Sequence, residues 1–211
     1  MSQIITEALI KTLIMVFAST ALSVILGFIP AILLTVTAND GLRPNKLIYG
    51  ILDFIVNTLR SFPFVILMVI IIPLTRAIVG KTTGTAAAVV PLTIAAAPFV
   101  SRVIESALRE VDKGVIEAAK SFGASDFQII FKVMVKEAMP SIISGITLSI
   151  ISIIGYSAMA GAVGAGGVGA VALTYGYQRF DNAVMIYTVI TLIIIVQILQ
   201  GAGNLAYKKL K

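Results

Sequence analysis

Apolar segments long enough to cross a membrane alternate with short polar segments along the chain. A helix needs about 20 mainly apolar residues to cross the hydrocarbon core of a bilayer. Five stretches approach or exceed this length, at residues 13–36, 47–73, 85–103, 142–163 and 183–205. The first and third contain Pro30, Pro91 and Pro98, which membrane helices tolerate because neighbouring helices can satisfy the backbone groups that proline frees. The pattern predicts an all-α polytopic membrane protein with about five transmembrane helices.

The composition is that of a protein surrounded by lipid. Charged residues make up 12% and hydrophobic residues 58% of the 211 residues, whereas a soluble domain carries about 25% charged residues. Such a chain has too little polar side chain to cover a water-exposed surface, so the bilayer must cover much of the exterior. Cysteine and histidine are absent, which excludes disulfides, thiol catalysis, haem ligation and nearly all zinc sites. We expect no metal and no cofactor.

Lysine and arginine are divided unevenly between the polar segments. With the N-terminus outside, the inner segments are 37–46, 104–141 and the tail from residue 207, and together with Arg102 at the membrane edge they hold eleven of the 16 basic residues. The outer segments hold four, and Arg60 lies inside a span. An excess of basic residues in short loops marks the cytoplasmic side, so we predict N-out, C-in. This placement accounts for the net charge of +6 without a nucleic-acid partner.

The N-terminus carries no basic region and no small-residue cleavage site. We therefore expect the first apolar segment to remain as a span rather than to be removed as a signal peptide.

The longest inner loop, at about residues 104–141, is predicted to begin with a short amphipathic helix. An apolar stripe runs over residues 115–122, and Gly123 ends it, because glycine readily takes the positive φ found after many helices. The helix either rests on the membrane surface as part of an amphipathic hairpin or presents its apolar face to a partner protein in the helix-in-groove manner.

A second helix is predicted in the same loop. Ser125 followed by Gln128 has the form of a capping box, with a serine at the N-cap and a glutamine three residues later. The helix would run over residues 126–139, and Pro140 would mark its end.

The first loop helix resembles the coupling helix of bacterial ABC-transporter permeases. Glu117, Ala118 and Ala119, followed by Gly123, match their E-A-A-x-x-x-G signature. In that family the helix sits in a cleft of a cytoplasmic ATPase and couples its ATP-driven movement to the membrane helices. The resemblance implies that the alanines allow close approach, Glu117 supplies a charge or a capping bond, and Gly123 supplies the sharp turn. The family motif usually continues as Ile-x-Leu-Pro ten residues after the glycine; this chain has Val-Met-Val-Lys there, which keeps the aliphatic residues and lacks the proline.

Three further stretches are similar to methionine-importer permeases. They are residues 60–64, residues 90–99, and residues 155–169 together with 175–180, and the likeness runs from about residue 57 to the C-terminus. It implies a homodimer in a bacterial inner membrane that works with two copies of a separate ATPase and an extracytoplasmic methionine-binding lipoprotein. We expect residues 1–211 to form a single transmembrane permease domain, with the coupling loop at about 104–141.

A glycine-rich run at residues 164–169 matches G-x-G-x-x-G without the setting of a dinucleotide site. That site needs a preceding strand, a following helix and an acidic residue about 20 positions on, whereas Asp181 comes only 12 residues after Gly169. We interpret the run as an exit from the fourth span whose small residues permit close helix contact or bending. The sequence contains no G-x-x-x-x-G-K-[ST] phosphate loop, so we expect a transport subunit rather than an enzyme, with ATP hydrolysis on a partner chain.

Four residues are candidates for the translocation pathway or its gate: Arg60, Ser157, Met159 and Gly161. Arg60 is an intramembrane charge, which is a functional hypothesis by default; alternatively it snorkels to the inner interface or pairs with Asp53. Met159 has a flexible, polarizable side chain that suits an apolar gate or contact with a thioether. Each of the three residues in the fourth span can equally serve ordinary packing.

The predicted function is alternating access. ATP binding in partner subunits would move the helix around residues 117–123, and the spans would rock to expose the pathway to either side, with methionine or a related amino acid as cargo. Two other classes stay open. An ion-coupled secondary transporter would work without an ATPase and usually shows broken helices with paired intramembrane charges. A non-transporting membrane scaffold subunit would tolerate loss of the glycine-rich run and of Met159.

Overall fold

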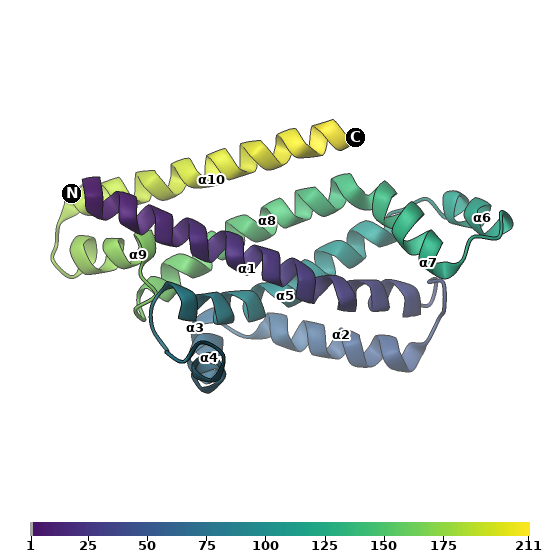
Figure 1. Cartoon of the computed structure of the whole chain (residues 1–211), viewed down its shortest axis with the longest axis horizontal. Helices are drawn as coiled ribbons and strands as arrows, with labels where there is room; N and C mark the ends of the chain where they lie inside the picture. The colour runs from purple at the N-terminus through teal and green to yellow at the C-terminus, as the bar shows by residue number, and fades with distance from the viewer. Residues whose placement is uncertain (1) are drawn as a thin grey trace.

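The computed structural model describes residues 2–211, which form helices joined by short turns and contain no strand. In Figure 1 the long helices lie along the longest axis of the molecule, with α6 and α7 at one end and α9 at the other. The elements, of which η1 and η2 are π-helical, are α1 (Ser2–Thr37), α2 (Lys46–Ser61), α3 (Phe64–Ile70), α4 (Ile72–Val79), α5 (Thr85–Arg109), α6 (Lys113–Ser121), α7 (Asp126–Gln128), η1 (Ile129–Met134), α8 (Val135–Gly161), α9 (Gly167–Val171), η2 (Ala172–Tyr177) and α10 (Asn182–Leu210).

Four helical stretches are long and apolar enough to cross a membrane. They are Gln3–Thr37, Thr85–Arg109, Asp126–Gly161 and Asn182–Leu210. Helices α2 and α3 meet the same criteria jointly, as a bent fifth span. The prediction of an all-α protein with about five transmembrane helices is confirmed, although each of the four continuous helices extends beyond the span predicted for it at one or both ends.

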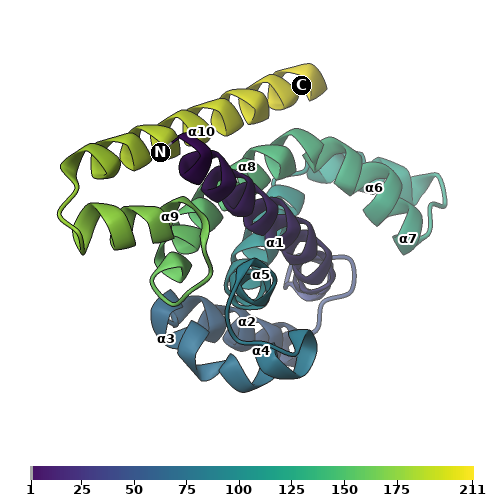
Figure 2. The same cartoon turned by 60° about the vertical axis from the view of Figure 1, so that its left-hand side comes forward.

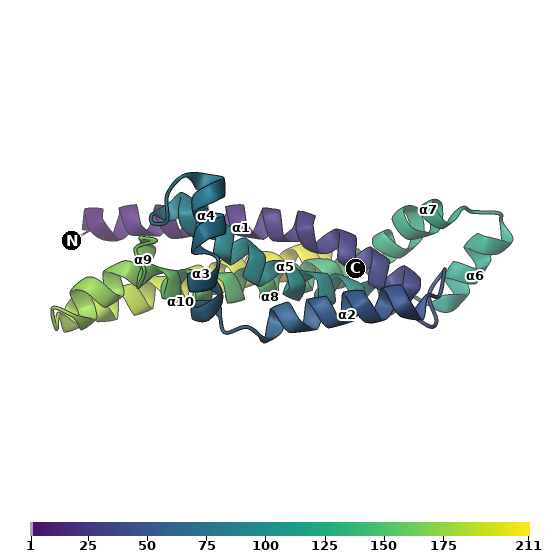
Figure 3. The ribbon, with the colours of Figure 1, turned by 90° about the horizontal axis from the view of Figure 1, so that it is seen from below.

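The prediction of one continuous helix over residues 47–73 is wrong. Helices α2 and α3 are bent by 102° relative to each other, and Figure 3 shows α3 and α4 running across the long helices. Pro63 explains the break, because a residue before proline is driven out of the helical region, and Phe62 is extended at φ −71° and ψ 127°. Pro73 lies in the first turn of α4, where a missing backbone N–H is tolerated.

Pro140 does not end the helix that precedes it, contrary to the prediction. The helical run continues from Asp126 through η1 and α8 to Gly161. Ala138 and Ile142, on either side of the proline, are both buried in the core cluster at the end of α5. Membrane helices continue past a proline when neighbouring helices support them, so the predicted second loop helix and the fourth span are one element.

Helices α1 and α5 approach each other closely through small residues. Every fourth position on one buried face of α1 is small: Ser19, Ser23, Gly27 and Ala31. The Ser23 hydroxyl donates a hydrogen bond to the Thr93 carbonyl of α5 at 3.2 Å. A Cβ added at Gly27 would lie only 2.6 Å from the Ala97 carbonyl oxygen. This is the small-xxx-small contact by which membrane helices bring their backbones together.

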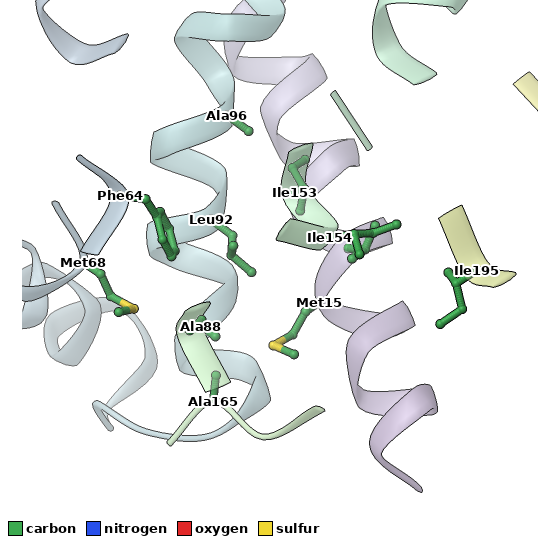
Figure 4. Close-up of a cluster of buried hydrophobic side chains, with 12 residues drawn as sticks. Met15, Phe64, Met68, Ala88, Leu92, Ala96, Ile153, Ile154, Ala165 and Ile195 are labelled. Atoms are coloured by element: carbon green, nitrogen blue, oxygen red, sulfur yellow. The ribbon is translucent and has the colours of Figure 1, made fainter. Parts of the chain in front are cut away.

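The largest core cluster joins α1, α3, α5, α8 and α10. Met15, Leu92 and Ile153 are almost completely buried, and Figure 4 shows them between α1, α5 and α8. Phe64 stacks on Tyr156 with the ring centroids 4.9 Å apart, which fixes α3 to α8. A second cluster joins the end of α5 to η1 through the buried residues Ile104, Leu108, Ile129 and Met134.

Helix α10 lies at the edge of the bundle (Figure 2). Its buried side chains are Val184, Thr188 and Ile195, whereas isoleucines such as Ile190 and Ile194 are exposed. An exposed face this apolar fits the hydrocarbon core of a bilayer.

Extra side-chain volume at Gly27 is expected to destabilise the fold. In Gly27→Val the new atoms must displace the α5 backbone, and overpacking of this kind costs about 1–3 kcal/mol. Thermal unfolding in mild detergent should therefore show a lower midpoint. Gly50→Ala is the matched control, because nothing lies within 4 Å of a Cβ at that exposed position of α2, and its midpoint should equal or exceed that of the wild type. Equal midpoints for the two variants would contradict the close α1–α5 contact.

Candidate coupling surface and translocation residues

Helix α6 is fixed at both ends by its own sequence. The Asp112 carboxylate caps its start and accepts hydrogen bonds from two backbone N–H groups of the first turn, at 2.7 and 3.2 Å. Gly123 follows its end at φ +77°, a left-handed conformation that costs other residues about 1–2 kcal/mol. Ser125 and Gln128 then form the capping box, with hydrogen bonds of 2.9 and 3.3 Å. The turn and the capping box predicted from the sequence are confirmed.

The residues of the E-A-A-x-x-x-G string do not share one face. Glu117 and Ala118 are exposed, whereas Ala119 is partly buried against the core cluster at the end of α5. Phe122, just before Gly123, is 90% exposed. Helix α6 therefore presents Glu117, Ala118 and Phe122 outward and uses Ala119 to hold itself on the bundle.

A second exposed phenylalanine, which sequence reasoning missed, lies beyond the turn. Phe127 is 67% exposed, and its ring centroid is 4.5 Å from that of Phe131. Its position inside the capping box, between Ser125 and Gln128, was the available signal. Figure 3 shows α6 and α7 projecting at one end of the molecule. Large exposed apolar side chains at such a projecting end indicate an interaction surface.

Glu117 is free to pair with another molecule. Its carboxylate has no hydrogen-bond or ion-pair partner among residues 2–211. The charges at the start of α6 are instead paired internally: the Asp40 carboxylate lies 3.3 Å from Lys113 Nζ and 3.2 Å from the Arg109 guanidinium. Hydrogen bonding from Lys113 holds the pKa of Asp40 below its ordinary value. The exposed face of α6 thus carries the unpaired carboxylate of Glu117, whereas the charges at the start of the helix are paired with one another.

Among the three candidates on α8, Met159 alone faces outward. It is 49% exposed. Ser157 is buried, and its hydroxyl donates to the Ile154 carbonyl of the same helix at 2.7 Å. Gly161 is also buried, and a Cβ there would lie 2.4 Å from the Ala170 backbone nitrogen. The structure therefore does not bring these three residues together on one surface.

The glycine-rich run makes the close contacts that were predicted for it. A Cβ at Gly169 would lie 2.4 Å from the Ala158 Cα of α8. Gly167 adopts φ +81°, and the next backbone N–H, that of Val168, donates to the Thr12 hydroxyl of α1 at 2.9 Å. The run thus packs the chain after α8 against both α8 and α1.

Arg60 lies exposed near the end of α2, where the chain bends into α3. Its guanidinium carbon is 5.9 Å from the centroid of the Phe99 ring, and no carboxylate in residues 2–211 pairs with it. The alternative that Asp53 pairs with Arg60 is wrong, because Asp53 forms its ion pair with Arg102 of α5. Arg60 is therefore an exposed cation beside the break in the bent span.

A pocket between α3, α4, α5 and the chain after α8 was not predicted. Its lining includes Met68, Thr75, Ala87, Pro91 and Val163, and none of the four candidate pathway residues. The expectation of a continuous helix over residues 47–73 concealed it, because the pocket exists only where α3 and α4 turn aside. In the described part of the chain no three acidic, histidine or cysteine side chains are grouped so that they could hold a metal ion.

A family model and two curated relatives match most of the chain. The model of the family described as "Binding-protein-dependent transport system inner membrane component" matches residues 23–208. The probable D-methionine transport system permease protein MetI of Vibrio cholerae is 46% identical over 203 residues, which cover 96% of this chain and 90% of that protein. The methionine import system permease protein MetP of Bacillus subtilis is 44% identical over 173 residues, which cover 82% and 78%.

Solved structures have the same fold. A chain from the MetNI methionine ABC transporter, determined in inward-facing conformations, superposes with a TM-score of 0.98 at 40% identity, covering 100% of this chain and 98% of that one. A chain from an amino acid ABC transporter solved with histidines superposes with a TM-score of 0.80 at 18% identity, covering 99% and 94%. The second likeness shows the fold alone.

Gly123→Ala is expected to loosen the turn between α6 and α7 without a steric clash. Nothing lies within 4 Å of a Cβ at Gly123, so the effect comes from the left-handed backbone, at about 1–2 kcal/mol for alanine. Asparagine enters this conformation more readily, so Gly123→Asn should have an intermediate effect. The readout is hydrogen exchange of the Ala124 amide, which donates to the Ala119 carbonyl at 3.1 Å. Equal protection in all three proteins would show that the turn does not depend on positive φ.

Proposed function

The chain belongs to the family of binding-protein-dependent transport system inner membrane components, and on that premise we propose that it is the permease subunit of an ATP-driven importer of methionine or a related amino acid. The observation that carries the proposal is the exposed α6, with its unpaired Glu117, in a chain that is 46% identical to a probable D-methionine permease. The protein is a multi-pass component of a bacterial inner membrane. It is a transport subunit rather than an enzyme, and ATP is hydrolysed by a partner chain.

The permease works as a homodimer with two copies of a cytoplasmic ATPase. An extracytoplasmic binding lipoprotein delivers the amino acid to it. The likeness to a chain of the MetNI methionine ABC transporter supports this assembly. The bend between α2 and α3 is a feature expected of the rival secondary transporters as well, but membership of the family decides against that class and against a non-transporting scaffold.

In the membrane the N-terminus lies outside and α6 lies inside. The excess of basic residues in the loops on the α6 side supports this orientation. Residues 1–211 act as one permease domain, with the coupling loop at about 104–141. The ATPase contacts Glu117, Ala118 and Phe122, while Ala119 and Gly123 keep α6 attached to the bundle in one orientation. Movement of the ATPase then displaces the bundle and opens the pathway alternately to the two sides.

Arg60 and Met159 face the pathway, and Ser157 and Gly161 shape it from behind by packing. The exposure of Arg60 beside the break in the bent span supports its role, since an amino acid carries a carboxylate that an unpaired guanidinium can bind. The exposed thioether of Met159 is flexible enough to close an apolar gate and to open again.

Substitutions in α6 and in the turn after it are expected to release the ATPase. Glu117→Ala removes the unpaired charge and should lower recovery of the ATPase, and Gly123→Pro should abolish it, because proline fixes φ near −65° where the turn needs +77°. The assay is pull-down of the tagged permease from mild detergent, with the ATPase measured in the eluate. Lys81→Ala, in the exposed turn before α5, is the control and should retain wild-type recovery. A wild-type permease that recovers no ATPase would overturn the proposed function.

Loss of the Arg60 charge is expected to slow transport without loss of assembly. Arg60→Met should lower ATP-driven methionine uptake into proteoliposomes by about tenfold, since a hydrogen bond to a charged group contributes about 1.5–3 kcal/mol. Arg60→Lys should retain part of the rate. Arg76→Met removes another exposed arginine, on α4, and should leave uptake unchanged. Uptake that is the same in Arg60→Met and Arg76→Met would remove Arg60 from the pathway.

A further inference from the structure

Six charged side chains of alternating sign form a continuous series from α2 to the start of α6. In order they are Asp53, Arg102, Glu105, Arg109, Asp40 and Lys113. The series connects the bent span, the end of α5, the turn between α1 and α2, and the coupling helix, all of which are separate in the sequence.

Arg102 holds the centre of this series by contacting two carboxylates at once. Its Nη1 donates to Glu105 at 2.7 Å within α5, and its Nη2 donates to the Asp53 carboxylate and, at 3.5 Å, to the Asp53 carbonyl of α2. The Tyr49 hydroxyl of α2 donates to the other oxygen of Glu105 at 3.4 Å. A planar guanidinium can make such a fork, and a lysine ammonium cannot reproduce it.

The outer part of the series reaches α6. Arg109 lies 3.8 Å from Glu105 and 3.2 Å from Asp40, and Lys113, the first residue of α6, lies 3.3 Å from Asp40. These outer side chains are between 42% and 71% exposed, so water and salt screen them.

Because they are buried, Arg102 and Glu105 form the most strongly held pair of the series. The Glu105 side chain is only 5% exposed and that of Arg102 18%. A buried carboxylate that loses its partner is strongly destabilising, so Glu105 keeps Arg102 in place on α5. The guanidinium of Arg102 therefore already points toward α2. Asp53 binds it without further loss of conformational freedom in the arginine side chain.

Few other side-chain contacts join α2 to α5: the Tyr49 hydroxyl donates to Glu105, and the Arg60 guanidinium lies 5.9 Å from the Phe99 ring centroid. Of its 16 residues, Val56 is the buried one, and apolar side chains such as Leu47 and Phe54 are exposed at 73% and 71%. Hydrophobic packing alone thus holds α2 weakly, and the ion pair of Asp53 with Arg102 is the contact that joins opposite charges on α2 and α5.

We infer that the Asp53–Arg102 pair makes α2 follow α5 when α6 is displaced. Arg102 is then a positioning residue for transport: α6 moves the end of α5, and the pair carries that movement to α2 and to Arg60 at its end. The inference rests on the proposed function, because it needs an ATPase that displaces α6. It predicts that the pair is required for coupling ATP hydrolysis to uptake rather than for assembly.

The decisive variant is Asp53→Asn, assayed in the complete complex in proteoliposomes. It removes the negative charge of Asp53 but leaves Glu105 paired with Arg102, so the fold and the buried carboxylate are preserved. Recovery of the ATPase and its rate of ATP hydrolysis should stay close to wild type. Methionine uptake per ATP hydrolysed should fall by about fivefold or more, the lower end of the range for an allosteric coupling.

Asn57→Ala is the matched control on the same helix. The Asn57 amide donates to the same Asp53 carboxylate at 3.1 Å but does not join α2 to α5, so this variant should retain the wild-type ratio of uptake to hydrolysis. Arg102→Lys keeps the charge without the fork and should give an intermediate ratio.

The outcomes separate the two proposals. A wild-type permease that neither binds the ATPase nor takes up methionine would refute the proposed function. A wild-type permease that transports, together with an Asp53→Asn variant of unchanged uptake per ATP, would leave the proposed function standing and overturn the inference. An equal loss of coupling in Asn57→Ala would overturn it too, because the effect would then not depend on the contact between α2 and α5.

Discussion

The close approach of α1 and α5 is the contact on which the rest of the fold depends. Lipid tails are as apolar as leucine, so burial of apolar surface does not drive helices together within the bilayer, and close van der Waals packing must do so. Gly27 and Ser23 allow the two backbones to meet. Once it is fixed to α1, α5 becomes the axis of the bundle and contacts α2, α3, α4 and α8 as well. It is also followed after a short turn by α6, so the helix at the centre of the fold carries α6 at its end.

Buried hydroxyl groups also gather at the contact between α1 and α5. Most buried hydroxyls in the long helices donate to a carbonyl of their own helix, as Thr35 and Ser149 do. Ser19 and Ser23 of α1 instead donate to carbonyls of α5, and within the described residues the buried hydroxyl oxygens of Thr93 and Ser101 have no protein partner. Both lie where α5 faces Ser23 and Gly27 of α1. Four buried hydroxyls thus lie at the contact between α1 and α5, and two of them join the helices directly.

Local signals in the sequence predicted more of the structure than long-range ones did. The four continuous spans, the positive φ of Gly123 and the capping box at Ser125 each follow from a few neighbouring residues, and each is present in the structure. The break at Pro63 was also a local signal, but the apolar run across it suggested one span. At Pro140 the sequence predicted a helix end, whereas the helix continues. Packing of Ala138 and Ile142 against α5 keeps it continuous, and no local pattern contains that contact. The ion pair of Asp53 with Arg102 joins residues 49 positions apart, and nothing in the spacing favoured it over Arg60.

The exposed apolar faces of α10 and α2 differ in what can cover them. The exposed face of α10 carries isoleucines such as Ile190 and Ile198, and hydrocarbon can solvate it at no cost. The exposed face of α2 is also apolar at Leu47 and Phe54, but it ends at Arg60, whose charge has no partner in the described chain. A charge within a span is costly in contact with lipid and normally faces protein or a water-filled cavity. The bend of 102° just after Arg60 turns α3 across the bundle, so the charge of Arg60 lies where the span breaks. The same proline that breaks the span therefore leaves its cation at a position where protein or water, rather than lipid, must surround it.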